Sequence, residues 1–155
     1  MEIEVKINGQ LCKASVSADM RLLEFLREQG YASVKCGCDT SNCGLCTVWL
    51  DEKPVLSCSV LAVRTHKREI TTLEGLKEQV LAFGTILADQ GAEQCGFCNP
   101  GFIMNVLALE KEFPNPTLEQ IQTYLAGNLC RCSGYQGQLR AMQQYFQKKQ
   151  EVTHG

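Results

Sequence analysis

The sequence predicts an α+β fold in which a small sheet domain precedes a helical domain. Two observations carry this prediction. Residues 3–56 contain two pairs of strand-like segments on either side of a short amphipathic segment, and the apolar residues after residue 77 recur with helical spacing. The chain has 155 residues, of which 45% are hydrophobic and 21% charged, so it can form small domains with hydrophobic cores.

The first strand pair is predicted by the alternating segment Ile3–Ile7 and by residues 11–16, which are joined by Asn8-Gly9. Asparagine and glycine accept the positive φ angles that a two-residue hairpin turn requires. A short helix follows, with Asp19 as its expected N-cap and Gly30 as its expected stop. Its apolar face consists of Leu22, Leu23 and Leu26.

A second strand pair is predicted at residues 47–50 and 55–56, on either side of the polar turn 51–54. The polar stretch Arg64–Glu69 then interrupts the apolar pattern and is expected to be a linker. Thr71–Glu74 has the spacing of a helix capping box. We therefore expect a sheet domain of residues 1–76 and a helical domain of residues 77–155.

Four helices are expected in the second domain. They cover residues 77–90 and 101–112, a segment after a second capping box at Thr117–Gln120 with Gly127 as its stop, and residues 138–148. Apolar residues cover so much of the second helix that we expect it to be buried on most sides; they are Phe102, Ile103, Val106, Leu107 and Leu109. Residues 149–155 are expected to form a flexible tail.

Charge and hydropathy argue against two classes of partner. Fifteen Lys and Arg against seventeen Asp and Glu give a net charge of −2, which does not favour binding to nucleic acid. Residues 1–20 lack the apolar run of a secretion signal, and no stretch reaches the roughly 18 apolar residues of a membrane span. We therefore expect a cytoplasmic protein.

Ten cysteines are the most unusual feature of the composition. In a reducing compartment, metal binding explains so many thiols better than disulfides do. One set has the C-x4-C-x2-C spacing of plant-type 2Fe–2S ferredoxins, with a fourth cysteine after eleven intervening residues; its members are Cys38, Cys43, Cys46 and Cys58. Its loop has to coil tightly with N–H groups turned inward, for which Gly37 and Gly44 are suited.

The second set consists of Cys95, Cys98, Cys130 and Cys132. Its two pairs are separated by 31 residues, and each pair lies at an end of a predicted helix. Two helices joined by a turn bring such ends back together, so four thiolates meet at one end of the helical domain. Amides of the helix that begins near Pro100 and Gly101 favour an anionic centre there.

Other interpretations of the cysteines are weaker. A structural zinc site also uses paired cysteines, but C-x2-C combined with C-x-C departs from the common zinc spacings. No catalytic residue is expected, because the only histidines are His66 in the polar linker and His154 in the tail. Cys12 is interpreted as a strand thiol. Cys36 is interpreted as a bystander, with competition for the metal as the alternative.

Five motifs, in order along nearly the whole chain, carry a resemblance to a known family. They are residues 35–38 (KCGC), 43–48 (CGLCTV), 72–75 (TLEG), 94–101 (QCGFCNPG) and 127–135 (GNLCRCSGY). On these motifs the chain resembles the small iron–sulfur subunit of the molybdenum hydroxylases, the family of xanthine dehydrogenase, aldehyde oxidoreductase and the molybdenum–copper carbon monoxide dehydrogenase. The resemblance implies a β-grasp ferredoxin domain followed by a four-helix domain, each with one 2Fe–2S cluster.

The resemblance also implies a function. The chain is expected to be the electron-transfer subunit of a heteromeric molybdenum-dependent hydroxylase. It relays single electrons from the molybdopterin cofactor of a large partner subunit to an FAD subunit or another acceptor. Gln94 and Cys132 match positions that approach the pterin. The substrate, whether a purine, an aldehyde, an N-heterocycle or carbon monoxide, binds in the partner.

Two alternatives remain open at this point. A free-standing two-cluster ferredoxin would serve several oxidoreductases, and a zinc-bound interaction module would have no redox role. Within the family resemblance, Cys36, residues 39–42, Asn99 and residues 136–138 depart from the usual pattern. None of these departures removes a ligand, but neighbours of this kind tune the potential of a cluster.

Overall fold

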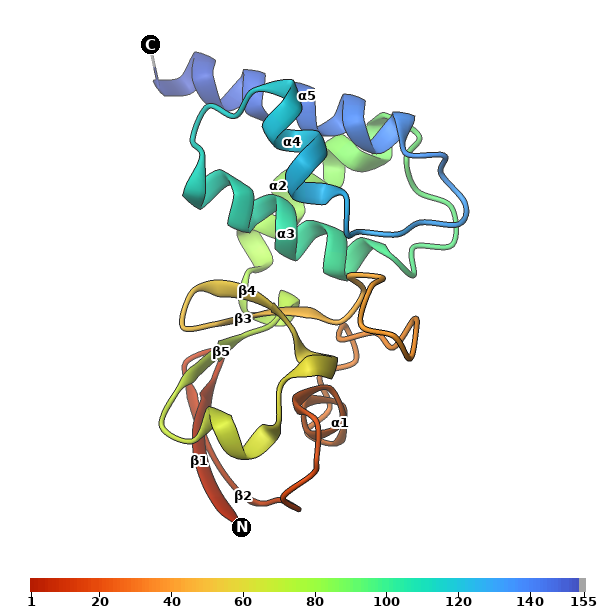
Figure 1. The fold of residues 1–155 in the computed structure, drawn as a ribbon. Coiled ribbons are helices and arrows are strands. Elements are labelled where there is room, and N and C mark those ends of the chain that lie inside the picture. Colours follow the sequence, from red (N-terminus) through yellow and green to blue (C-terminus); the bar gives the residue numbers. More distant parts are fainter. Residues whose placement is uncertain (154–155) are drawn as a thin grey trace.

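The computed structural model describes residues 1–153 and confirms the predicted α+β order. A five-stranded sheet with one helix comes first, and four α-helices follow in the described part of the chain (Figure 1). Figure 1 shows the sheet near the N-terminus and the helices near the C-terminus, in two stacked parts. No helix within residues 1–153 is long and apolar enough to cross a membrane.

The first hairpin forms as predicted. Strand β1 (Glu2–Ile7) pairs antiparallel with β2 (Gln10–Ser15). The turn residues Asn8 and Gly9 have φ angles of 51° and 79°, which are the left-handed values that a tight hairpin turn needs. Local turn chemistry therefore determines this part of the sheet.

The second hairpin differs from the prediction in its turn. Strands β3 (Thr47–Leu50) and β4 (Lys53–Leu56) are joined by two residues rather than by four, so β4 begins at Lys53. Asp51 and Glu52 take positive φ angles of 48° and 65° without a glycine. The Asp51 carboxylate accepts hydrogen bonds from the Glu69 N–H at 2.9 Å and from Arg68 Nε at 2.7 Å. Contacts with a distant segment thus hold the predicted turn in a two-residue form that its own residue types did not indicate.

Strand β5 (Glu69–Thr71) was not predicted. It lies at the centre of the sheet, in the order β2-β1-β5-β3-β4, and pairs parallel with β1 and antiparallel with β3. Only Ile70 within this three-residue strand is fully buried. The segment is extended because β1 and β3 pair with it on both sides. The polar residues that precede it gave no indication of a strand in the sequence.

Helix α1 (Leu22–Glu28) has the predicted apolar face, since Leu22, Leu23 and Leu26 are all buried. Gly30 has a φ angle of 91° just after the helix, as expected for its stop. The predicted N-cap is wrong. Arg21 rather than Asp19 occupies that position, because the Glu24 carboxylate accepts a hydrogen bond from the Arg21 N–H at 3.2 Å.

The four predicted helices of the second half are present: α2 (Lys77–Asp89), α3 (Asn99–Glu112), α4 (Leu118–Leu125) and α5 (Gln136–Thr153). The capping box at Thr117 is confirmed, since the Gln120 N–H donates to Thr117 Oγ1 at 3.2 Å. The expected capping box at Thr71–Glu74 is wrong. A 3-10 turn (Leu73–Gly75) forms there, and α2 begins only after Leu76.

The predicted end of the last helix is also wrong. Helix α5 continues to Thr153, beyond the expected end at residue 148, and Lys149 in this extension forms an ion pair with Glu110 at 2.9 Å. The expected tail residues 154–155 lie outside the described residues. The buried character of α3 is confirmed, with all five predicted apolar residues in the core; these are Phe102, Ile103, Val106, Leu107 and Leu109.

Two hydrophobic cores support the two parts of the chain. One core lies between the sheet and α1 and is formed by apolar residues from the first seventy positions. The other core lies among helices α2 to α5. Trp49 is the exception, because it belongs to strand β3 but packs in the helical core. Its indole N–H donates to the Met104 carbonyl at 3.0 Å, which anchors α3 on the sheet.

The first turn of α3 lies so close to the cysteine-rich loop that there is no room for a side chain at Gly101. A Cβ atom placed on Gly101, in the first turn of α3, would contact the Gly44 carbonyl oxygen and would lie 2.9 Å from the Cα atom of Leu45. Such a contact is closer than van der Waals packing allows. Helix α3 therefore rests directly on the backbone of the cysteine-rich loop.

We predict that Gly101→Ala lowers the free energy of unfolding by about 1–3 kcal/mol, the usual cost of overpacking. The control is Gly84→Ala in α2, where an added Cβ meets nothing within 4 Å. That change should raise stability by about 0.5–1 kcal/mol, because alanine is the better helix former. Thermal unfolding of the two variants, followed by circular dichroism, measures both effects. Equal melting temperatures would contradict the tight contact.

Glu74 carries a second test of the fold. Its carboxylate accepts hydrogen bonds from the Ser33 N–H at 3.1 Å, from Ser33 Oγ at 2.7 Å and from Thr72 Oγ1 at 2.5 Å. Partial burial opposes ionisation, but the hydrogen bonds from Thr72 and Ser33 outweigh it and lower the pKa of Glu74 below its ordinary value of 4.5. Ionised Glu74 thus stabilises the fold.

Because the folded-state pKa is lowered, this stabilisation is present above pH 4.5 and is lost as the pH falls through the folded-state value. We predict that Glu74→Gln lowers the melting temperature near pH 7 by about 2–4 °C, which corresponds to about 1 kcal/mol. The difference from the unmodified protein should shrink as the pH falls below 4.5. Glu2→Gln, an exposed change on β1, serves as the control. A constant difference across this range would count against the network.

Candidate metal centres

The first cysteine set occupies the loop before β3 and the 3-10 turn after β4. Cys43 and Cys46 are buried, whereas Cys38 and Cys58 are partly exposed. The Ser57 hydroxyl donates to the Cys46 carbonyl at 2.7 Å, which ties the turn (Ser57–Ser59) to the end of the loop. The structure therefore brings together the four residues that their spacing grouped.

The thiols of this set meet in two pairs. Cys38 is hydrogen-bonded to Cys43, and Cys46 to Cys58. Hydrogen bonds from the backbone of Asn42 and from Cys43 lower the pKa of Cys38 to about 6, while burial raises the pKa of Cys46 to about 11. Amide donors around Cys38 thus favour a thiolate at the open side of the loop.

The pKa values of Cys43 and Cys58 are also shifted in opposite directions. Burial raises the pKa of Cys43. Burial also opposes ionisation of Cys58, but hydrogen bonds from Ser41 and Cys46 outweigh it and lower the Cys58 pKa. Each pair therefore combines one thiol that ionises readily with one that does not.

Glycine is required where the loop wraps around the sulfur atoms. A Cβ atom on Gly37 would lie 3.3 Å from Cys43 Sγ and 2.6 Å from Leu45 Cδ2. Gly44 has a φ angle of 76°, and a Cβ there would lie 2.5 Å from the Gly127 carbonyl oxygen. The expected close approach to sulfur is found at Gly37, whereas Gly44 has the expected positive φ angle and meets the Gly127 carbonyl rather than a sulfur atom.

The second set lies in two loops of the helical part. Cys95 and Cys98 precede α3, of which Cys98 is the N-cap, and the other pair lies between α4 and α5. Cys132 Sγ and Cys95 Sγ are 3.6 Å apart, and Cys98 is hydrogen-bonded to Cys130. The expected convergence at one end of the helices is observed.

Burial and local donors again act differently on the members of this set. Burial, together with the thiol of Cys130, raises the pKa of Cys98 to about 12. Burial also opposes ionisation of Cys130, but hydrogen bonds with Ser133, which include one from its backbone N–H, outweigh it and lower that pKa. The Ser133 N–H lies 3.3 Å from Cys130 Sγ. The hydrogen bond to Cys95 raises the pKa of Cys132.

Both sets border one pocket of about 560 Å³, which residues from the two loops line together. The Leu129 N–H donates to the Cys43 carbonyl at 2.9 Å, so the loop before Cys130 is hydrogen-bonded to the loop of the first set. Asn105 reinforces this junction, because its amide donates to Asn128 Oδ1 at 2.8 Å and to Thr47 Oγ1 at 3.3 Å.

The remaining predicted residues lie at the surface. Gln94 Nε2 donates to the Cys132 carbonyl at 3.0 Å, so the two residues expected near the pterin are adjacent and exposed. Cys36 is exposed and contacts the Cys38 carbonyl, and Cys12 contacts Gln29. Sequence reasoning did not assign roles to Ser133 and Gln138, which contact sulfur atoms; no spacing rule identifies such residues.

The donor set fits two-iron centres. Among the described residues, no three Cys, His, Asp or Glu side chains come close enough together to hold a single metal ion. Each set presents its thiols in two adjacent pairs, which suits a centre of two irons with two cysteines on each. Fold and site together therefore define a two-domain iron–sulfur protein of the 2Fe–2S type.

Comparisons with known proteins agree with this class. Residues 5–80 match the family described as "2Fe-2S iron-sulfur cluster binding domain", and residues 72–143 match the 2Fe-2S binding domain family that accompanies it. The chain is 45% identical over 138 residues to the xanthine dehydrogenase iron-sulfur-binding subunit of Escherichia coli O157:H7, covering 86% of this chain and 87% of that one. It is 40% identical over 136 residues to the nicotinate dehydrogenase small FeS subunit of Eubacterium barkeri, with coverage of 86% and 87%.

A solved structure, quinoline 2-oxidoreductase from Pseudomonas putida 86, superposes with a TM-score of 0.89 at 33% identity. The match covers 97% of this chain and 96% of that one. The chain belongs to the family of small 2Fe–2S iron–sulfur subunits of the molybdenum hydroxylases.

We predict that the protein purified without oxygen contains about four irons and four acid-labile sulfides per chain. Cys38→Ser should reduce the iron content to about two, because one set loses a ligand while the other stays intact. Cys36→Ser, two residues away, is the matched control and should keep the full content. Iron and sulfide assays with visible absorption measure the outcome. Zinc in place of iron, or iron loss from Cys36→Ser, would refute the assignment.

Proposed function

We propose that this chain relays single electrons from a molybdopterin cofactor in a large partner subunit to an FAD subunit or another acceptor. The observation that carries the proposal is the junction between the two cysteine sets. The Cys43 carbonyl accepts a hydrogen bond from the Leu129 N–H, and Leu129 is bonded directly to Cys130. Atoms of the chain thus form a short route from one set of sulfur atoms to the other.

We assign the ligands by set. The first cluster is held by Cys38, Cys43, Cys46 and Cys58, and the second by Cys95, Cys98, Cys130 and Cys132. When bound, each cluster supplies a one-electron redox couple, which for plant-type centres lies near about −400 mV. The chain contributes the thiolates and the amide donors around Cys38. Cys43 and Cys46 are buried, so water is excluded from their side of the cluster.

The second set is the side that faces the molybdopterin subunit in this proposal. Cys95, Cys132 and Gln94 are exposed there. Three large apolar side chains around them are also exposed by 45–46%; these are Phe97, Leu129 and Tyr135. Exposed apolar groups that cluster around a functional site indicate a protein contact. The FAD subunit or other acceptor then lies on the side of the first set.

Two further assignments complete the proposal. The domains are residues 1–76 and 77–155, which agrees with the two hydrophobic cores and with the overlap of the two family matches at residues 72–80. We place the chain in the cytoplasm, because a reducing compartment keeps the eight proposed ligand cysteines from forming disulfides.

Electron relay can be tested in the complex purified with its natural partner chains. We predict that Cys130→Ser abolishes turnover with xanthine, nicotinate or quinoline and an artificial acceptor, while bound molybdopterin stays in place. The signal of the first cluster should also persist, because its four cysteines are unchanged. Cys36→Ser is the control and should keep full turnover. Unaltered turnover in Cys130→Ser would overturn the relay.

Co-purification separates the relay subunit from a free-standing carrier. A subunit should come out of a mild purification with two larger chains, held by its exposed apolar groups. A monomer loaded with two clusters and free of other chains would favour the carrier. The measurement is the mass of the tagged chain and of what accompanies it.

A further inference from the structure

Gln138 is a buried polar residue that binds a sulfur atom rather than the backbone. It lies in the first turn of α5 and is 4% exposed. Other buried polar side chains, such as Thr47, Ser57 and Thr65, donate to backbone carbonyls three or eleven residues away in the chain. Gln138 instead contacts Cys98, forty residues away.

A chain of hydrogen bonds orients the Gln138 amide. Its Nε2 donates to Cys98 Sγ at 3.8 Å, and its Oε1 accepts from Ser133 Oγ at 3.3 Å. Ser133 Oγ in turn accepts from the Tyr135 N–H at 3.1 Å. Because the serine hydroxyl donates to the amide oxygen, the amide nitrogen has to face the sulfur atom.

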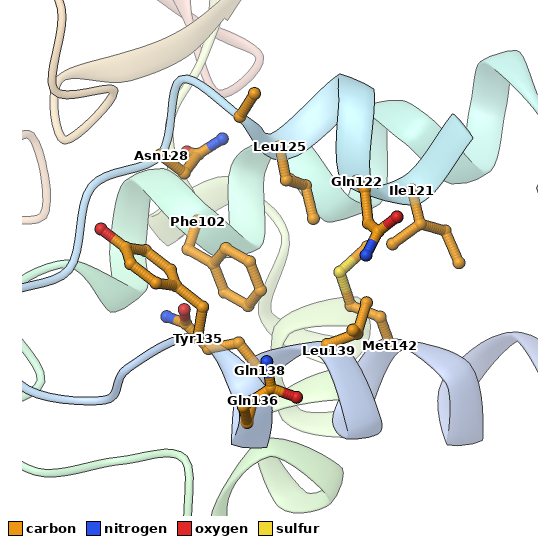
Figure 2. Close-up of a pocket in the computed structure, with 11 residues that line it drawn as sticks. Phe102, Ile121, Gln122, Leu125, Asn128, Tyr135, Gln136, Gln138, Leu139 and Met142 are labelled. Atoms are coloured by element: carbon orange, nitrogen blue, oxygen red, sulfur yellow. The ribbon is translucent and has the colours of Figure 1, made fainter. Parts of the chain in front are cut away.

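The surroundings favour this contact. Figure 2 shows Gln138 beside Tyr135 and Gln136, at the end of a pocket of about 300 Å³ formed between α3, α4 and α5. None of the side chains that line the pocket carries a charge, and Gln138 itself is 4% exposed. A hydrogen bond is electrostatically stronger in such a buried, low-dielectric position than in water.

We propose that Gln138 raises the midpoint potential of the second 2Fe–2S cluster by donating a hydrogen bond to Cys98 Sγ. Reduction adds one electron and no proton, so the negative charge on the sulfur ligands increases. A donor to sulfur therefore stabilises the reduced state more than the oxidised state. Gln138 is a positioning and tuning residue and not a ligand.

This inference deepens the proposed function and rests on Cys98 being a ligand of the second cluster. If that cluster receives the electron from the partner subunit, its higher potential makes the first transfer more favourable. The effect is confined to one cluster, because the described contacts of Gln138 include no residue of the first set.

The test is a potentiometric titration of the two-cluster protein followed by electron paramagnetic resonance. Gln138→Met keeps the length of the side chain and removes the donor. At a fixed potential, the ratio of reduced to oxidised second cluster should fall about three- to tenfold, or about 30–60 mV for a one-electron couple. The first cluster is an internal reference and should not shift.

Gln136→Met is the matched control. Gln136 lies two residues earlier in α5, lines the same pocket and is exposed. It should leave both potentials unchanged. An unchanged second-cluster potential in Gln138→Met with full iron content would overturn this inference and leave the proposed function intact. Absence of the second cluster from the unmodified protein would instead overturn the proposed function.

A second measurement uses protein that retains Gln138, so it does not depend on the Gln138→Met variant keeping its cluster. Glutamine labelled with ¹⁵N in the side chain should give a hyperfine coupling in the pulsed resonance signal of the second cluster. Gln94 also lies near this set, so the spectrum is recorded in Gln94→Met. A coupling that persists there supports the Gln138 contact, and its absence overturns it.

Discussion

The structure depends on a contact between two pieces of backbone. The first turn of α3 rests on the loop of the first cysteine set at Gly101 and Gly44, where neither position has room for a Cβ atom. The Leu129 N–H closes the same junction on the Cys43 carbonyl. Each part of the chain has its own core and can gather its own four thiols, and this contact, together with the Trp49–Met104 and Asn105–Thr47 hydrogen bonds, joins the two parts. The relay function follows from that proximity, because electrons pass between centres that are close together.

The two sets solve the same electrostatic problem with different groups. Burying sulfur excludes water but disfavours the thiolate, as the raised pKa values of Cys46 and Cys98 show. In the first set, backbone amides of the tight loop offset this cost at Cys38. In the second set, the Ser133 N–H lies 3.3 Å from Cys130 Sγ, and a side chain, that of Gln138, donates to Cys98. Side-chain donors can differ between relatives without changing the fold, so they are the natural means of tuning a cluster.

Prediction from the sequence succeeded where a structural signal is complete within a few residues. The Asn8-Gly9 turn, the Thr117 capping box and the Gly30 helix stop are all of this kind. It failed where distant residues supply the hydrogen bonds. The Asp51-Glu52 turn is held by Arg68 and Glu69, and β5 is extended because β1 and β3 pair with it. The Thr71–Glu74 segment has the capping spacing, yet Glu74 binds Ser33, forty-one residues away, and a 3-10 turn forms instead of a helix.

The sequence alone determined the two groups of four cysteines, their order along the chain and the class of fold that carries them. Cysteine spacing and hydrophobic periodicity are properties of neighbouring residues, and they are visible without a structure. The tertiary structure decided how the thiols pair, which sulfur atoms are buried, and that Cys43 meets Leu129 while Cys98 meets Gln138. The Cys43–Leu129 and Cys98–Gln138 contacts join residues that are forty or more positions apart in the sequence. They arise only when packing of the two cores fixes the loops in space, and no local pattern encodes them.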